Sequence, residues 1–274
     1  MKRILDILIQ ILFLIVLSII SENTIYCQEN PQNTKQEALI ELPQGCKLVL
    51  DANIDLTDIV SIKIVDGIHN ILPQIQKLIP ADSTTIKLAI SSVNILPVWG
   101  IGSRTISGTI DQHREETVEI YYDPSHSNFK VEFIMCAIAH ELHHVCRVRM
   151  PDFQVTILEC MVNEGLADHF MVEILHCEKT PWSSALTEEQ IQQYMIRVKP
   201  LMREKFESWT KELDIWMLYG KPEPDPIPGW TGYSIGWRIV ENYLKAHPEA
   251  LASSLVFTSP EVIVSSTPEL MISK

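Results

Sequence analysis

The sequence predicts an α+β fold, in which a small β-sheet with helices is followed by a mainly helical lobe. Between residues 84 and 123, three segments are rich in β-branched residues or alternate apolar with polar residues, as strands do. After residue 150, apolar residues recur with helical spacing instead. The strands are expected at 84–91, 104–111 and 117–123.

The helices are indicated by apolar spacing and by the residues that interrupt it. In the first helix, apolar residues from Ile59 to Leu72 are three or four positions apart, and Pro80 ends the pattern. Pro151 separates the second helix from the third, and the Pro-rich segment 222–229 precedes the last. The C-terminal tail shows no clear period. The helices are expected at 55–79, 130–147, 156–176, 187–200, 202–219 and 233–246.

The first residues predict export from the cytoplasm. A basic start, Met1 to Arg3, is followed by an apolar run that only a few polar residues interrupt, which is typical of a secretory signal. The apolar stretch after Gln10 is short for a membrane span. We therefore expect a periplasmic or secreted protein. A membrane tether at the N-terminus, through a retained helix or a lipid on Cys27, is the alternative.

The elements together predict one folded domain after this leader. Residues 1–27 are expected to be the signal peptide or anchor, and the polar residues 28–54 a flexible lead and entry to the domain. Residues 55–274 then form a single catalytic domain. Its parts are an α/β lobe at 55–150 and a helical lobe at 151–274.

The charge and cysteine content limit the partners and cross-links. With a net charge of −13, the chain is unsuited to nucleic acid or to anionic membranes. No cysteine pair has zinc-finger spacing. Cys136 and Cys160 precede two candidate metal ligands by one turn each, so they could meet across a helix pair. The sequence does not decide whether Cys136 and Cys160 form a disulfide, and two buried thiols are the favoured interpretation. The oligomeric state is left open.

The most informative string is AIAHELHHV, which contains an HExxH motif. His140 and His144 are four residues apart and therefore share one face of a helix, where both imidazoles can reach one ion. Glu141 lies beside that ion, where it can hold a water. His143 is also near this face, but we interpret it as a core histidine or a neighbour of the ligands. Two amphipathic helices with buried histidines are the non-functional interpretation.

A second string, VNEGLADHF, supplies the remaining groups of a metal site. Glu164 follows His144 after nineteen residues, which allows a second helix to return antiparallel. Two histidines and one carboxylate leave a zinc position open, which is typical of catalytic sites. Asp168 is one turn after Glu164 and can accept a hydrogen bond from the outer nitrogen of a ligating histidine.

At these residues the chain resembles the gluzincin metallopeptidases. HELHH and NEGLAD, with their thermolysin-like spacing, are most similar to the YjaZ-like family of predicted zinc-dependent proteases. The strong resemblance covers about residues 134–170, with a weaker one at 232–244. The chain lacks the G-x-M-E-N segment with which the aminopeptidases of this group hold a substrate amine. The resemblance therefore favours an endopeptidase, and an aminopeptidase is a further alternative.

The resemblance implies a mechanism and a substrate. A peptide or protein would be hydrolysed by a zinc-activated water, with Glu141 as the general base. Tyr233 is the candidate donor to the oxyanion, because gluzincin-like enzymes use a downstream Tyr or His; His169 and His176 are weaker candidates. In this family's layout the strand before the motif helix binds the substrate.

For this strand the segment at 117–123 is the candidate, with residues 98–108 as a cleft wall. Ordinary core strands are an equally good interpretation of both segments. A non-catalytic zinc-dependent binding or sensing protein is the alternative of a different class. The intact Glu141 favours the enzyme, because a binding module has no use for a base at this position.

Overall fold

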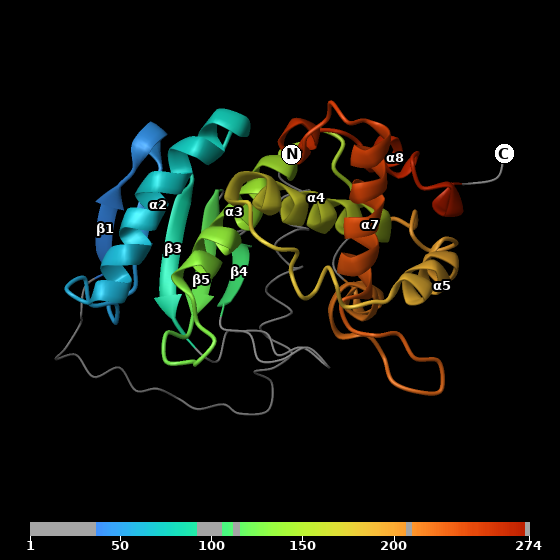
Figure 1. Ribbon diagram of the computed structural model, residues 1–274, viewed down its shortest axis with the longest axis horizontal. Coiled ribbons are helices and arrows are strands. Elements are labelled where there is room, and N and C mark those ends of the chain that lie inside the picture. The colour runs from blue at the N-terminus through green and yellow to red at the C-terminus, as the bar shows by residue number, and fades with distance from the viewer. Residues whose placement is uncertain (1–36, 92–105, 112–115, 207–209, 272–274) are drawn as a thin grey trace.

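The fold places a mixed β-sheet and a group of helices side by side (Figure 1). Two long helices, residues 131–147 and 157–175, meet where the two halves join. The computed structural model describes residues 37–91, 106–111, 116–206 and 210–271. The strand order is β1-β2-β3-β5-β4, in which β2, β3 and β5 are parallel and the two edge strands are antiparallel to their neighbours. The strands are β1 (Ala38–Glu41), β2 (Lys47–Leu50), β3 (Thr85–Ile90), β4 (Ile106–Asp111) and β5 (Thr117–Tyr122).

One face of the sheet is covered by α2 (Ile59–Leu78) and α3 (Val131–Arg147) (Figure 1). Along the three parallel strands every second side chain is buried against these helices, because successive side chains of a strand point to opposite faces. Asp58 caps α2 by accepting hydrogen bonds from the backbone N–H groups of Val60 and Ser61. The sheet, α2 and α3 share one hydrophobic core.

The other half is helical and has its own core. α7 crosses α4 in this half, as Figure 1 shows. Short helical turns follow α7 to the end of the described chain. The elements are α4 (Ile157–Leu175), α5 (Glu188–Val198), α6 (Lys211–Leu213), η2 (Asp214–Tyr219), α7 (Thr231–Ala246), η3 (Ala252–Leu255), α8 (Pro260–Val264) and η4 (Pro268–Leu270).

α4 belongs to both cores. Its first half, from Ile157 to Leu166, is buried in the helical half, whereas Phe170 and Met171 are buried with the sheet. Where α4 meets α7, Gly165 and Gly236 allow the two backbones to touch. A methyl group added to Gly165 would collide with the carbonyl of Gly236. A helix that is buried on all sides can bring polar groups from its length into the middle of the molecule.

A buried ion pair joins the end of α3 to the start of α4. Arg147 has no exposed surface, and its Nε and Nη2 atoms both lie 2.8 Å from Oε1 of Glu159. Its Nη1 also donates to the carbonyls of Val256 and Thr258, at 3.1 and 3.0 Å. Burial lowers the pKa of Arg147, and the Glu159 carboxylate opposes that shift. The guanidinium thus ties both central helices to the C-terminal segment.

The predicted fold class is confirmed, with two differences in the elements. Residues 202–219 were expected to be one helix, but of the described residues in this range only 211–219 are helical. The preceding residues run beside the start of α4, where the Met202 carbonyl accepts from Leu158 N at 2.8 Å and Phe206 N donates to Val155 at 2.9 Å. These bonds satisfy backbone groups that a continuous helix would have left unpaired.

The second difference concerns the lead at 28–54. Residues 38–41 and 47–50 are strands of the sheet, so the folded part begins earlier than expected. Cys46, Leu48 and Leu50 are buried in its core. The predicted leader at 1–27 lies outside the described residues. Within the described chain, no helix combines the length and apolarity that a membrane span requires.

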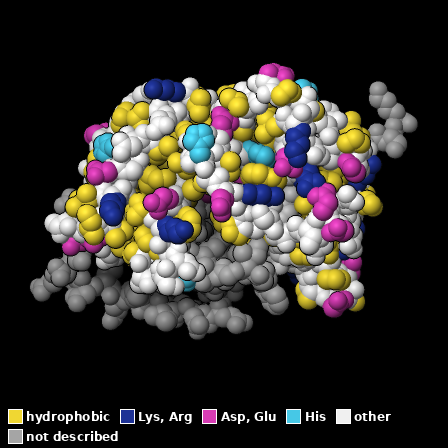
Figure 2. All heavy atoms as spheres, in the orientation of Figure 1, with side chains coloured by type: hydrophobic (Ala, Val, Ile, Leu, Met, Phe, Trp, Pro, Cys, Tyr) yellow, Lys and Arg dark blue, Asp and Glu magenta, His cyan; other side chains and the backbone are white. Residues whose placement is uncertain are grey.

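Charged side chains are dispersed over the surface. On the face shown in Figure 2, Lys and Arg alternate with Asp and Glu over both halves, with hydrophobic side chains between them. The excess of acidic groups in the sequence is therefore not gathered into one patch on this face.

The Arg147–Glu159 pair leads to a stability prediction. Arg147→Met should lower the free energy of unfolding by about 3–5 kcal/mol, because Glu159 would be left buried without its partner. Urea unfolding measures this loss. The double variant Arg147→Met/Glu159→Leu should recover much of it. Lys245→Met, which removes the exposed ion pair with Glu241, should change stability by less than about 1 kcal/mol. An unchanged midpoint for Arg147→Met would contradict this role.

Candidate metal centre

The candidate site lies where α3 and α4 face each other. His140 and His144 are on one face of α3, and both are buried. Glu164 is on α4 and is partly buried. The two imidazole rings meet edge to face, with ring centroids 4.5 Å apart. The helical spacing of the histidines and the packing of the two helices thus place three ligand groups together.

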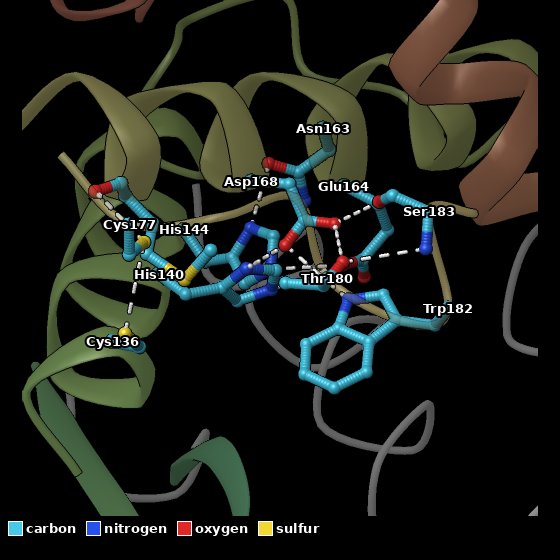
Figure 3. A network of polar contacts seen from close by, with 11 residues as sticks. Cys136, His140, His144, Asn163, Glu164, Asp168, Cys177, Thr180, Trp182 and Ser183 are labelled. Carbon is cyan, nitrogen blue, oxygen red and sulfur yellow. Dashed lines mark hydrogen bonds and ion pairs between the residues drawn. The ribbon is translucent and has the colours of Figure 1, made fainter. Parts of the chain in front are cut away.

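The ligand atoms of these residues converge on one point, as Figure 3 shows. The Nε2 atoms of His140 and His144 are 2.9 Å apart. Oε2 of Glu164 lies 3.1 Å from the first nitrogen and 3.3 Å from the second. Ligand atoms around a tetrahedral zinc, with bonds of 2.0–2.1 Å, are about 3.3 Å from one another. The spacing of the three donors is close to that value.

The outer ring nitrogens of both histidines are also engaged. Nδ1 of His140 lies 2.9 Å from Oδ1 of Asp168, and Nδ1 of His144 lies 2.9 Å from Oδ1 of Asn163. Both oxygens are acceptors, so each Nδ1 carries a proton and each Nε2 presents a lone pair inward. Two lone pairs and a carboxylate then face one another, which is stable only with a cation between them. The donor set therefore fits zinc.

Asp168 accepts more hydrogen bonds than the other described side chains of the site. It has no exposed surface, and four groups donate to its carboxylate. Besides His140, these are Thr180 Oγ1 at 3.0 Å, Trp182 Nε1 at 3.3 Å and the hydroxyl of Ser183. Figure 3 shows the segment after α4 bringing these donors to Asp168. A buried carboxylate needs such partners, and here they also fix its direction toward His140.

The pKa directions agree with a site built for a cation. Burial lowers the pKa of His140, but hydrogen bonds to Asp168 and Glu164 outweigh it and raise the pKa well above the ordinary value. Burial raises the pKa of Glu164, and the adjacent histidines outweigh it, so that the net shift is downward. Positive charge at this point is therefore stabilised, whether proton or metal supplies it.

Glu141 lies beside the ligands, next to the edge of the sheet. It is 8% exposed and approaches Gly108 on β4 so closely that an added Cβ there would lie 2.7 Å from Cγ of Glu141. A side chain at position 108 would occupy the space of the Glu141 carboxylate. Gly108 is the last residue of the segment 98–108 that was expected to form a cleft wall, but its contact with Glu141 was not predicted.

The prediction that the strand at 117–123 binds the substrate is wrong. The segment at 117–123 forms β5, which is hydrogen-bonded to β3 on one side and to β4 on the other. It has no edge left for a peptide. β4 is the edge strand, and no strand within the described residues pairs with its outer side. Of the expected cleft wall at 98–108, residues 106–108 belong to β4, and the rest lies outside the described residues.

The other histidines of this region do not join the ligand set. His143 is fully buried against Phe170, at a centroid distance of 5.5 Å. Its ring nitrogens have no hydrogen-bond partner among the described residues, and burial lowers its pKa well below the ordinary value. His169 stacks on Trp237 and donates to its carbonyl, and burial lowers its pKa to about 4. His176 ends α4 in a left-handed conformation.

Tyr233 is in the first turn of α7, and its ring and that of Trp230 are perpendicular, with centroids 4.8 Å apart. The next residue, Ser234, donates to the carbonyl of Trp182 at 3.0 Å. Since Trp182 also donates to Asp168, this turn of α7 is linked to the ligand network through one residue.

Cys136 and Cys160 are both free thiols, as the favoured interpretation had it, but the neighbour of Cys136 is a different cysteine. Sγ of Cys136 is 3.9 Å from Sγ of Cys177, in the segment after α4. Cys160 packs instead against the core of the helical half. The described cysteines are all free thiols. Because Cys160 and Cys136 serve different halves of the molecule, the one-turn spacing from their ligands did not bring them together.

Comparisons with known proteins agree with this geometry. The family model described as "Predicted Zn-dependent protease (DUF2268)" matches residues 101–265. The uncharacterized protein YjaZ of Bacillus subtilis (strain 168) is 31% identical over 127 residues. That alignment covers 44% of this chain and 46% of YjaZ, and thus about half of the relative's length. No solved structure matches the chain significantly.

The ligand set leads to a prediction about metal content. His140→Ala and His144→Ala should each remove most of the bound zinc, because two remaining protein ligands hold the ion poorly. His143→Ala is the matched control, since it removes a neighbouring imidazole that faces the core, and it should retain about one zinc per chain. Elemental analysis of purified protein measures the stoichiometry. Full zinc in both ligand variants, or its loss in the control alone, would contradict the assignment.

Asp168 leads to a second prediction. Asp168→Ala should weaken zinc affinity by about 10–100-fold, because His140 would lose the acceptor that fixes its tautomer. Competition with a chelator of known affinity measures the change. Asn163→Ala should have an effect in the same direction through His144. Unaltered affinity in the Asp168 variant would show that the hydrogen bond does not support the ligand.

Proposed function

Because the chain belongs to the family of predicted Zn-dependent proteases, we propose that it is a zinc-dependent endopeptidase. The observation that carries the proposal is the convergence of His140, His144 and Glu164 on one point. Among the described residues three protein ligands meet there, which leaves one position of a tetrahedral ion for water or substrate. Catalytic zinc sites have this arrangement, whereas structural sites are closed by four protein ligands.

Glu141 is the proposed general base. Zinc at this site would acidify a water and polarise the peptide carbonyl. Glu141 follows ligand His140 directly on α3 and is nearly buried, so its carboxylate can take the proton of that water and return it to the leaving amine. Gly108 leaves room for this carboxylate against β4. A binding protein would have no need of a base here.

The proposed substrate site is the outer edge of β4. An extended peptide can add to a free strand edge through main-chain hydrogen bonds. β4 forms the edge of the sheet, and Gly108 brings that edge into contact with Glu141. A peptide bound there would pass beside the base and the ligands. Main-chain recognition of this kind does not require a free amino terminus, which favours an endopeptidase.

Tyr233 is the proposed second donor to the oxyanion. It lies one turn before Gly236, where α7 touches α4 at the residue that follows Glu164. The turn that carries Tyr233 is also connected to Asp168 through Ser234 and Trp182. These contacts link the start of α7 to Asp168 and to the turn of α4 that carries Glu164, and they support the choice of this hydroxyl.

The location and partners are proposed from the sequence. The basic and apolar N-terminal residues support export to the periplasm or medium, with or without a tether to the membrane. The acidic composition favours peptide or protein substrates over nucleic acid.

The test is cleavage of a peptide library by the purified protein with and without zinc. Glu141→Gln should keep its zinc and its fold but lose about 10²–10⁴-fold in turnover, the usual contribution of a general base.

Gly108→Ala should also retain zinc and lose activity, because the new methyl group displaces the Glu141 carboxylate. Tyr233→Phe should lower kcat with little change in KM, since an oxyanion donor acts in the transition state.

The library also separates the alternatives. Peptides with blocked amino termini distinguish an endopeptidase, which cleaves them, from an aminopeptidase, which does not. Unchanged turnover in Glu141→Gln would remove this residue from the mechanism. No cleavage by the zinc-loaded wild type would favour a zinc-dependent binding or sensing protein.

A further inference from the structure

Two cysteines lie together at the rim of the ligand network. Cys136 is on α3, one turn before His140, and Cys177 is the second residue after α4. Their sulfur atoms are 3.9 Å apart although 41 positions separate them in the chain. We propose that Cys136 and Cys177 form a disulfide that holds the segment 177–183 against α3 and thereby stabilises the metal centre.

The local backbone favours closure of this bond. α4 ends at Leu175, and His176 adopts a left-handed conformation (φ 51°, ψ 32°) that turns the chain back toward α3. Cys177 is outside any helix, so it can move while Cys136 remains fixed by its helix. The sulfurs must approach from 3.9 Å to about 2.05 Å, and a small shift of the connecting segment supplies this.

The consequence for the metal centre follows from what the segment carries. Thr180, Trp182 and Ser183 supply three of the four hydrogen bonds to Asp168. Figure 3 shows the cysteine pair beside these hydrogen bonds, on the side of His140 away from Trp182 and Ser183. Asp168 in turn holds His140 on the helix that bears Cys136. The disulfide would thus close a ring through both helices and restrain the donors that orient Asp168.

The chemistry is thiol–disulfide exchange with a disulfide-containing oxidant, either a small molecule or a protein. The thiolate of Cys177 attacks one sulfur of the oxidant, forms a mixed disulfide and releases one thiolate. Cys136 then gives up its proton and attacks the sulfur of Cys177, which releases the second. Two protein thiols are oxidised, and one external disulfide is reduced to two thiols.

The environments of the two thiols suit these roles. The hydrogen bond from Cys136 lowers the pKa of Cys177, which makes it the first nucleophile. The same contact, together with burial, raises the pKa of Cys136, which makes it the resolving thiol. Cys46 and Cys146 are fully buried in the core of the sheet half, and burial raises the pKa of both.

The first measurement is peptide mapping of the purified full-length chain under non-reducing conditions, after oxidised or reduced glutathione. We expect a cross-link between Cys136 and Cys177 only after oxidation, and a Tm higher by about 5 °C or more. Zinc release to excess chelator should be about tenfold slower in the oxidised protein, given the usual influence of groups behind the ligands. The zinc result rests on the proposed zinc site, whereas the cross-link and the Tm do not.

The variants decide the assignment. Cys136→Ala and Cys177→Ser should each abolish the cross-link and the dependence of Tm and zinc release on oxidation, whereas Cys160→Ala should keep both. Because Cys177 lies outside the helices, its variant tests the proposal even if Cys136→Ala folds poorly. A cross-link that joins other cysteines, or none, would overturn the disulfide. A cross-link with equal zinc release before and after oxidation would overturn its effect on the metal centre.

Discussion

The burial of the Asp168 carboxylate is the constraint around which the site is organised. A carboxylate without exposed surface is stable only when hydrogen-bond donors surround it. His140 on α3 and the segment from Thr180 to Ser183 meet this need from two sides. These donors satisfy the buried carboxylate. Because His140 donates to it through Nδ1, the Nε2 atom of this imidazole is left to bind a metal.

α4 makes that burial possible because it belongs to both halves of the molecule. One of its ends packs in the helical core and the other in the core of the sheet, so its middle, with Glu164 and Asp168, lies at the junction. The glycine contact with α7 and the ion pair between Arg147 and Glu159 hold α4 in position from two further directions. The candidate metal centre thus lies on helices that are held at several points, which preorganises its ligand groups.

The edge strand shows where sequence reasoning was limited. Three of the five strands, β3, β4 and β5, were recognised from their own composition, because alternation and β-branching are local properties. The position of a strand in the sheet depends on pairing with strands distant in the chain. The last strand before the motif helix proved to be interior, and the preceding one, β4, forms the edge beside Glu141. The non-helical course of 202–206 has the same origin, because this segment is hydrogen-bonded to the start of α4.

The sequence by itself determined the α+β class, most of the helices and the candidate ligand trio, because helical periodicity sets which residues share a face. His140 and His144 face one point for this reason, and the spacing to Glu164 allowed a returning helix. Only the tertiary structure decided that Asn163 supports His144, that residues 180–183 surround Asp168, and that Cys136 meets Cys177 rather than Cys160. These contacts join different elements, and their geometry arises from packing, which no local spacing encodes.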